Sequence, residues 1–456
     1  MAARFSLRAG ALAAAAAALA GCSFMPAYER PAAPVAASFD TPAAEAGTPA
    51  AELAWRDFIT DPRTRALVDV ALRENRDLRV AALNVEQARA ALGIQNADRL
   101  PNVGVGAIGS RTSVSSSYTA GFMLSSFEID LFGRVKSLSA AAAARVLASD
   151  EARRTVQLGL IAAVASAELA LRADDDLLAV TDQVLAGRAE TLRLAKLRFD
   201  GGLAGEPEYR SAESVLAAAR VSRLALQRQR MQDLNALVLL LGQPLTADLP
   251  PPRPLADHQL QDLPAGVPSQ VLLQRPDVRA AEQQLIAANA SIGAARAAFF
   301  PRITLTGSLG TASTHLSDLF QNTAWSFAPQ LLQPLFDAGR NQANLAATQA
   351  GRDIAVAQYE KAVQTAFREV ADALAGRATL GAQRQAQQAQ ADAETRRLVL
   401  ADLLLKNGAA SALDRLDAER AQLAARQAVV QLQLAERQNA LLLYRVLGGG
   451  ALLPQS

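Results

Sequence analysis

The chain has 456 residues, of which half are hydrophobic, but much of that share is alanine and aromatic residues make up only 5%. Such a composition suits long, closely packed helices better than a core of large side chains. The 46 basic and 44 acidic residues give a formal charge of +2, and this near balance offers no electrostatic footprint for nucleic acid.

The first 21 residues have the pattern of a bacterial lipoprotein signal peptide. Two arginines precede an apolar segment from Ala9 to Ala20, and Leu19-Ala20-Gly21-Cys22 forms a lipobox. A segment this short with such flanks predicts a cleaved signal rather than a membrane span. We expect the Cys22 thiol to carry lipid that anchors the chain at about 0.8 kcal/mol per buried CH₂. The alternative is an ordinary signal peptide that contains a cysteine by chance.

Residues 22–54 are predicted to form the lipidated N-terminus and a tether, since Pro26 to Pro49 is rich in alanine, proline and threonine. The folded body then begins near Trp55. Beyond the N-terminus we expect no segment with the length and apolarity of a transmembrane helix. Any membrane crossing by the mature chain is therefore not made by hydrophobic helices.

Two halves of the chain share one plan. Arg79–Pro101 aligns with Arg279–Pro301 at an offset of 200, and Gly202 matches Gly408 at an offset of 206. Repeats with such an offset indicate an internal duplication. We assign the first repeat to residues 55–244, a proline-rich linker to 245–276, the second repeat to 277–447 and a tail to 448–456.

Long helices are predicted over about 134–200 and 206–241, and again over 339–406 and 411–447. These stretches lack interior prolines, each of which would cost about 3 kcal/mol. Apolar residues recur every seven positions, as in a coiled-coil seam. In the first half these are Val164, Leu171, Leu178, Leu185, Leu192 and Phe199, and in the second Leu416, Leu423 and Val430. Helices of this length must pack laterally against similar helices.

Two strands per half are predicted, over about 101–131 and 301–333, where apolar residues alternate with small or polar ones. Runs of about ten such residues fit membrane-spanning strands, although half-buried strands of soluble proteins look alike. An open sheet cannot lie in lipid with unpaired edges, and closed membrane barrels start at about eight strands. The chain must therefore oligomerise, and two or three copies both satisfy this arithmetic.

Enzyme functions find little support. The chain has only two histidines, His258 and His315, and its one cysteine is Cys22. Once Cys22 carries lipid, neither a zinc site nor a Cys/His nucleophile pair remains. We interpret the acidic run from Asp174 to Asp176 as a solvated helix face rather than a metal site. No cofactor other than the covalent lipid is expected.

Two motifs then suggest a family. Arg275-Pro276-Asp277-Val278-Arg279-Ala280-Ala281-Glu282 and Ile292-Gly293-Ala294-Ala295-Arg296-Ala297-Ala298-Phe299-Phe300-Pro301 resemble the TolC-like outer-membrane factors. Within that family they are similar to the NodT-type lipoproteins of resistance-nodulation-division efflux pumps. The resemblance extends over essentially the whole mature chain.

This resemblance implies a mostly α fold with a membrane β-barrel contribution. The protein would be a homotrimer whose twelve-stranded barrel in outer-membrane lipid continues into a periplasmic α-barrel of twelve helices. It would conduct substrates passively, with a periplasmic adaptor and an inner-membrane transporter as partners. Related ducts serve type I secretion or metal-ion export, and a structural coiled-coil lipoprotein is the alternative from another class.

The resemblance also assigns working residues. The hairpin ends at Gly202, Gly205, Gly408 and Ser411 would be the periplasmic tips that meet the adaptor. Leu413 would form an apolar plug, while Asp417 and Arg420 would form a ring of interchain salt bridges that closes the pore. The matching first-half positions are Pro207, Ser211 and Ser214, so only the second hairpin would carry this closure. The plain alternative for Asp417 and Arg420 is a solvated i,i+3 pair.

Overall fold

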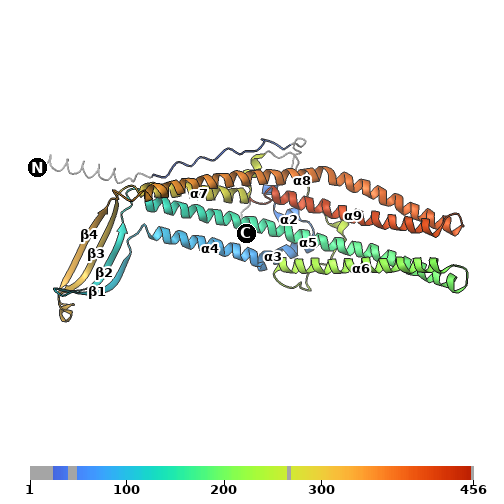
Figure 1. Cartoon of the computed structure of the whole chain (residues 1–456), viewed down its shortest axis with the longest axis horizontal. Coiled ribbons are helices and arrows are strands. Elements are labelled where there is room, and N and C mark those ends of the chain that lie inside the picture. Colours follow the sequence, from blue (N-terminus) through green and yellow to red (C-terminus); the bar gives the residue numbers. More distant parts are fainter. Residues whose placement is uncertain (1–23, 40–48, 264–268, 453–456) are drawn as a thin grey trace. The chain divides into compact units, whose positions relative to one another are not determined.

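The computed structural model describes residues 24–39, 49–263 and 269–452 (Figure 1). The chain divides into two compact units. The first contains residues up to 34 together with 81–153 and 277–363, and the second contains 35–80, 154–276 and the chain from 364 onward.

Each half of the chain runs helix, strand, strand, long helix, long helix. The first half has α4 (Arg76–Ala97), β1 (Val103–Arg111), β2 (Ser116–Glu128), α5 (Arg134–Asp200) and α6 (Glu206–Leu241). The second has α7 (Pro276–Ala297), β3 (Arg302–Ser313), β4 (Thr323–Leu332), α8 (Arg340–Lys406) and α9 (Ala412–Val446). The predicted duplication of two strands and two long helices is confirmed. The prediction did not include the helices α4 and α7, although the aligned segments before the paired prolines coincide with them.

The four strands of the first unit form one antiparallel sheet in the order β1-β2-β3-β4. Gly106 lies opposite Gly121, which lies opposite Gly310. A Cβ on Gly310 would come within 2.1 Å of the Ala120 carbonyl oxygen, so this row brings backbones closer than side chains allow. Among the described residues β1 pairs only with β2 and β4 only with β3. Both edges of the sheet are therefore unpaired within one chain.

Smaller elements complete the second unit. They are α2 (Trp55–Phe58), α3 (Pro62–Glu74) and the 3-10 turns Ala50–Glu52, Leu255–Asp257 and Ser269–Gln274, while a further turn, Leu316–Asp318, belongs to the first unit. Phe58 stacks on Tyr444 at 4.2 Å between ring centroids. The Tyr444 hydroxyl donates to the Leu53 carbonyl at 2.7 Å. These contacts join the start of the folded body to the end of α9.

The helix α5 corrects one expectation. Among the described helices it alone contains a stretch long and apolar enough to cross a membrane, and 56% of that stretch is buried inside the fold. A mostly buried stretch is what the core helix of a bundle shows. Alanine and leucine at close-packed positions raise the hydropathy of this stretch to that of a membrane span.

Both long hairpins turn through the same helix ending. Gly202 and Gly408 each have φ of +70°, the left-handed conformation that glycine adopts most readily. The amide of Ala409 donates to the Leu404 carbonyl at 2.8 Å, and that of Gly408 donates to Leu405 at 3.1 Å. Leu203 and Gly202 repeat this pair of bonds at the end of α5. The two glycines thus end α5 and α8 in Schellman motifs.

A substitution of Gly408 by alanine tests this ending. A left-handed alanine costs on the order of 1–2 kcal/mol, so the last turn of α8 should open more often. We expect amide hydrogen exchange at Ala409 to become about tenfold faster. Gly351→Ala is the control, because Gly351 lies inside α8 with open space beside it. Equal amide exchange rates at Ala409 in the two variants would show that the positive φ of Gly408 does not determine how often this turn opens.

Candidate functional site at the helix-hairpin ends

The three residues expected to form the gate lie on the first turns of α9. Leu413 is 70% exposed, and Asp417 and Arg420 are exposed as well. An exposed leucine beside two exposed charges is free to contact another molecule. Within one chain, therefore, nothing in the described fold covers these three side chains.

The Asp417 carboxylate has a partner within its own chain. Arg397, on α8, donates to Asp417 at 2.5 Å and also pairs with Glu394 at 3.2 Å. No ion pair joins Asp417 to Arg420 among the described residues. The carboxylate that was expected to bond between chains is thus shared with the neighbouring helix of the same hairpin.

The two hairpins begin their return helices differently. Ser411 caps α9 in a capping box: its hydroxyl accepts from the Asp414 amide at 3.2 Å, and the Ser411 amide donates to the Asp414 carboxylate at 2.9 Å. The Ser411 hydroxyl also donates to Asp414, and these bonds lower the pKa of that carboxyl. Gly205 caps α6 without a side-chain bond. The second hairpin therefore has the more firmly held start.

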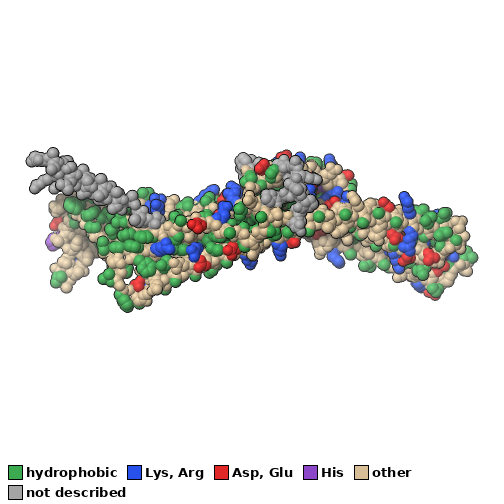
Figure 2. Space-filling model, turned by 90° about the horizontal axis from the view of Figure 1, so that it is seen from above, with side chains coloured by type: hydrophobic (Ala, Val, Ile, Leu, Met, Phe, Trp, Pro, Cys, Tyr) green, Lys and Arg blue, Asp and Glu red, His purple; other side chains and the backbone are tan. Residues whose placement is uncertain are grey.

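The first hairpin end is held by rings and surface charges instead. Phe199 stacks with Tyr209 at 5.6 Å between centroids, and Arg198 pairs with Glu208 at 2.7 Å. Figure 2 shows acidic and basic side chains intermixed near the hairpin ends, at the right of the view. Such exposed pairs contribute little to stability. Both ends also present an exposed leucine, Leu203 (77%) at the first and Leu413 (70%) at the second.

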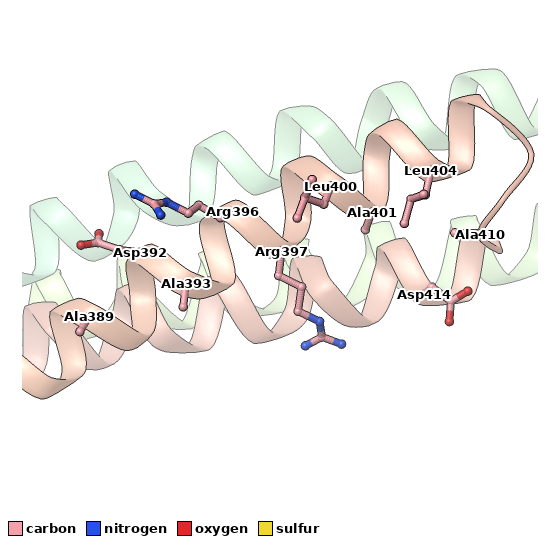
Figure 3. Close-up of a pocket in the computed structure, with 10 residues that line it drawn as sticks. All are labelled: Ala389, Asp392, Ala393, Arg396, Arg397, Leu400, Ala401, Leu404, Ala410 and Asp414. Carbon is pink, nitrogen blue, oxygen red and sulfur yellow. The ribbon is translucent and has the colours of Figure 1, made fainter.

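A groove of about 820 Å³ runs along α8 to the start of α9 (Figure 3). Its floor is small and apolar, and its rim carries charges of both signs. The lining residues are Ala389, Asp392, Ala393, Arg396, Arg397, Leu400, Ala401, Leu404, Ala410 and Asp414. Arg397 therefore belongs both to this groove and to the pair with Asp417.

A buried ion pair that sequence reasoning missed joins the two hairpins. Arg188, on α5, donates to Glu419, on α9, at 2.8 Å, and their side chains are only 9% and 8% exposed. Arg415 approaches Glu419 at 3.4 Å and also pairs with Asp402 on α8. Arg188 and Glu419 each follow a seam leucine, Leu185 and Leu416, by three residues. That position faces the partner helix in a heptad, so the spacing was the available signal.

The acidic run on α5 also differs from its expected solvated face. Asp174 is 6% exposed and packs against α6, and one of its carboxylate oxygens is buried without a hydrogen-bond partner. Burial, and then a hydrogen bond with Asp233, raise the pKa of Asp174 to about 7. Asp175 is neutralised by Arg172 at 2.8 Å and Arg230 at 2.5 Å. Asp174 therefore forms a carboxyl pair with Asp233 across α5 and α6, and it is Asp174 whose pKa this contact raises.

The described contacts are structural ion pairs and hydrogen bonds. Among the described residues, no group of three or more histidine, cysteine, aspartate or glutamate side chains is arranged to hold a metal ion. Cys22 lies outside the described part of the chain, so its predicted lipid stays a prediction. What the tips offer is exposed apolar surface, paired charges and a groove.

Comparison with known proteins decides the family. The model of the outer membrane efflux protein family matches residues 67–243 and 267–449. The chain belongs to this family. The resemblance stated from the sequence is confirmed, and with it an efflux-channel subunit of the outer membrane. The family consists of channel proteins rather than enzymes.

Individual relatives agree along almost the full length. The chain is 44% identical to outer membrane protein OprJ of Pseudomonas aeruginosa, over 95% of this chain and 94% of OprJ. It is 42% identical to the solvent efflux pump outer membrane protein SrpC of Pseudomonas putida, over 95% and 96%. The open state of the MtrE channel from Neisseria gonorrhoeae superposes with a TM-score of 0.87 at 40% identity, covering 94% of this chain and 99% of MtrE.

The buried ion pair of Arg188 and Glu419 should be needed to hold the two hairpins together. Removing one partner of a buried ion pair costs about 3–5 kcal/mol, whereas an apolar pair of similar volume is often tolerated. We expect Glu419→Leu to lower the temperature at which helical circular dichroism is lost, and Arg188→Met with Glu419→Leu to restore most of it. A double variant no better than the single one would contradict this account.

The carboxyl pair of α5 and α6 should make stability depend on pH. The folded pKa of Asp174 is about 7, above its usual 3.8. Its stabilising contribution is therefore complete below about pH 4 and is lost as the pH rises through 7. Asp174→Asn should remove the fall in melting temperature between pH 5 and pH 8. Asp175→Asn, which breaks ion pairs but keeps the carboxyl pair, should leave that fall in place.

Proposed function

We propose that three copies of this chain form the outer-membrane channel of a tripartite efflux pump. Each copy would contribute four strands to a closed barrel and four long helices to a periplasmic tube. The channel would conduct passively between an inner-membrane transporter with its adaptor and the exterior. The observation that carries the proposal is the sheet with two free edges.

The sheet has the shape and surface of a barrel segment. Its strands are 9, 13, 12 and 10 residues long, close to the 9–11 that cross a bilayer when tilted. On β4, Trp325, Phe327 and Leu331 are 63–76% exposed at alternate positions, which fits a face turned to lipid. Pairing β1 of one copy with β4 of the next would close the ring and satisfy both edges.

The helices also require a second copy. Within α4 only Val85 is buried, although Val80, Leu83 and Ile94 are 56–65% exposed. A helix that buries one residue has little to hold it in water, because helical stability in proteins comes mainly from packing. Contact with the helices of a neighbouring copy would cover this apolar surface.

The hairpin ends would act as the gate. Around a three-fold axis, copies of Leu413 would form an apolar constriction, with a ring of Asp417 and Arg420 beside it. The contact of Asp417 with Arg397 supports a refinement: the carboxylate would exchange between its own α8 and the neighbouring chain as the tips separate. Gly202, Gly205, Gly408 and Ser411 lie at the turns that an adaptor would meet.

The predicted lipid on Cys22 would hold the complex in the outer membrane, and transported compounds would be selected elsewhere in the pump. One relative is named for solvent efflux, so solvents belong beside antibiotics and metal salts in a susceptibility profile of a strain lacking this chain. Sensitivity to metal salts alone would favour a duct for metal-ion export instead.

Conductance of the purified trimer in planar bilayers tests the channel and its gate. We expect Asp417→Asn combined with Arg420→Gln to raise the open probability several-fold, because neither side chain can then form the interchain salt bridges that close the tips. Glu190→Gln is the control, since Glu190 forms an exposed pair with Arg193 away from the tip. The absence of conductance in every variant would refute the channel, and unchanged opening in the double variant would refute only the gate.

A further inference from the structure

The segment Phe24–Arg30 was expected to be a free tether, but it lies along α7. The Phe24 carbonyl accepts from Arg296 at 3.4 Å, and the Pro26 carbonyl accepts from Asn289 at 2.9 Å. Phe24, Pro26 and Tyr28 are half-buried, while the residues between them are exposed. We call this segment the strap. It is extended with one side on the helix, and it runs antiparallel to α7.

The C-terminal end of the strap is held by a carboxylate. Glu282 is 7% exposed, and Arg30 donates to both of its oxygens at 2.6 and 3.0 Å. The Tyr28 hydroxyl donates to the same carboxylate at 2.9 Å. Burial, followed by this bond to Glu282, raises the pKa of Tyr28. A buried carboxylate with a two-bond arginine is a strong and directional contact, and without the strap it would lack these partners.

The N-terminal end of the strap completes an aromatic cluster. The Phe24 ring stacks on Phe300 at 4.4 Å between centroids, and Phe300 stacks on Phe132 at 5.0 Å. Phe132 lies between β2 and α5, and Phe300 lies between α7 and β3. The cluster thus joins two of the connections between helix and sheet in the first unit, β2 to α5 from the first half of the chain and α7 to β3 from the second.

The face of α7 that binds the strap has no counterpart on α4. Its contacts come from Glu282, Asn289, Gly293 and Arg296, whose spacing places them on one side of the helix. A Cβ on Gly293 would come within 2.9 Å of the Met25 backbone and within 2.5 Å of the Ser137 hydroxyl oxygen on α5. At the matching offset of 200, α4 has Ala82, Arg89, Gly93 and Asn96. Gly93 has open space around it, and Ala82 cannot accept a hydrogen bond from its side chain.

We propose that one face of α7 is a recognition site for an extended peptide with an aromatic residue at its start and Tyr-x-Arg at its end. The strap is the ligand of this site, and its binding stabilises the two helix–sheet junctions at Phe132 and Phe300. The site does not depend on conduction, so a chain that failed as a channel would still bind its strap.

Amide hydrogen exchange of the full chain in detergent tests the proposal. The readout is the pair of junctions, residues 129–137 and 299–303. Arg30→Glu sets like charges against each other, so these amides should exchange about tenfold faster. A synthetic peptide with the sequence of residues 24–30 should restore their protection in a saturable manner, whereas a peptide with alanine in place of its final arginine should not.

Two further variants separate recognition from misfolding. Asn289→Ala removes the bond to the Pro26 carbonyl, so it should speed junction exchange and weaken rescue by the peptide. Its control is Ser291→Ala, because the Ser291 hydroxyl bonds only within α7, and this variant should leave junction exchange unchanged. Arg30→Glu combined with Glu282→Arg should recover protection, since the ion pair is restored with its charges reversed. Unchanged hydrogen exchange in Arg30→Glu and Asn289→Ala would show that the strap is a passive tether. Faster hydrogen exchange that neither the peptide nor the charge reversal corrects would overturn this face of α7 as a recognition site.

Discussion

Backbone hydrogen bonding at the edges of the sheet is the constraint on which the assembly depends. In lipid an unpaired N–H or C=O costs several kcal/mol, and β1 and β4 each present a full row of them in a single chain. In the proposed trimer, closure with other copies would satisfy these groups. Closure would also set a common axis, around which the exposed face of α4 and the exposed start of α9 would find their contacts.

Within one chain, buried charges determine how the hairpins pack. A seam of leucines alone fits several registers, whereas Arg188 has one carboxylate to meet, Glu419. Asp174 and Asp233 impose a similar condition that also depends on protons. Polar groups at seam positions commonly cost stability and specify alignment. The helix pairs are therefore aligned by a few costly contacts and held together by many apolar ones.

The elements could be read from the sequence because their signals are local. Proline and glycine mark the ends of α5 and α8, and seven-residue spacing marks the packed side of α5 and α9. Tertiary contacts leave no such local trace. The burial of Asp174, the pair of Arg188 with Glu419 and the docking of Tyr28 on Glu282 each join residues distant in sequence or on different helices. The sequence held one hint of the ion pair: Arg188 and Glu419 each stand three positions after a seam leucine.

The strap occupies only one of the two repeated helices, and this has a consequence for symmetry. In a ring of duplicated chains, each subunit contributes two similar helix pairs. The number of helix pairs around the ring is therefore twice the number of subunits. The strap on α7 and the capping box on α9 mark every second pair. A partner present in as many copies as there are helix pairs would meet two alternating kinds of binding surface. Its copies would therefore bind in two inequivalent ways.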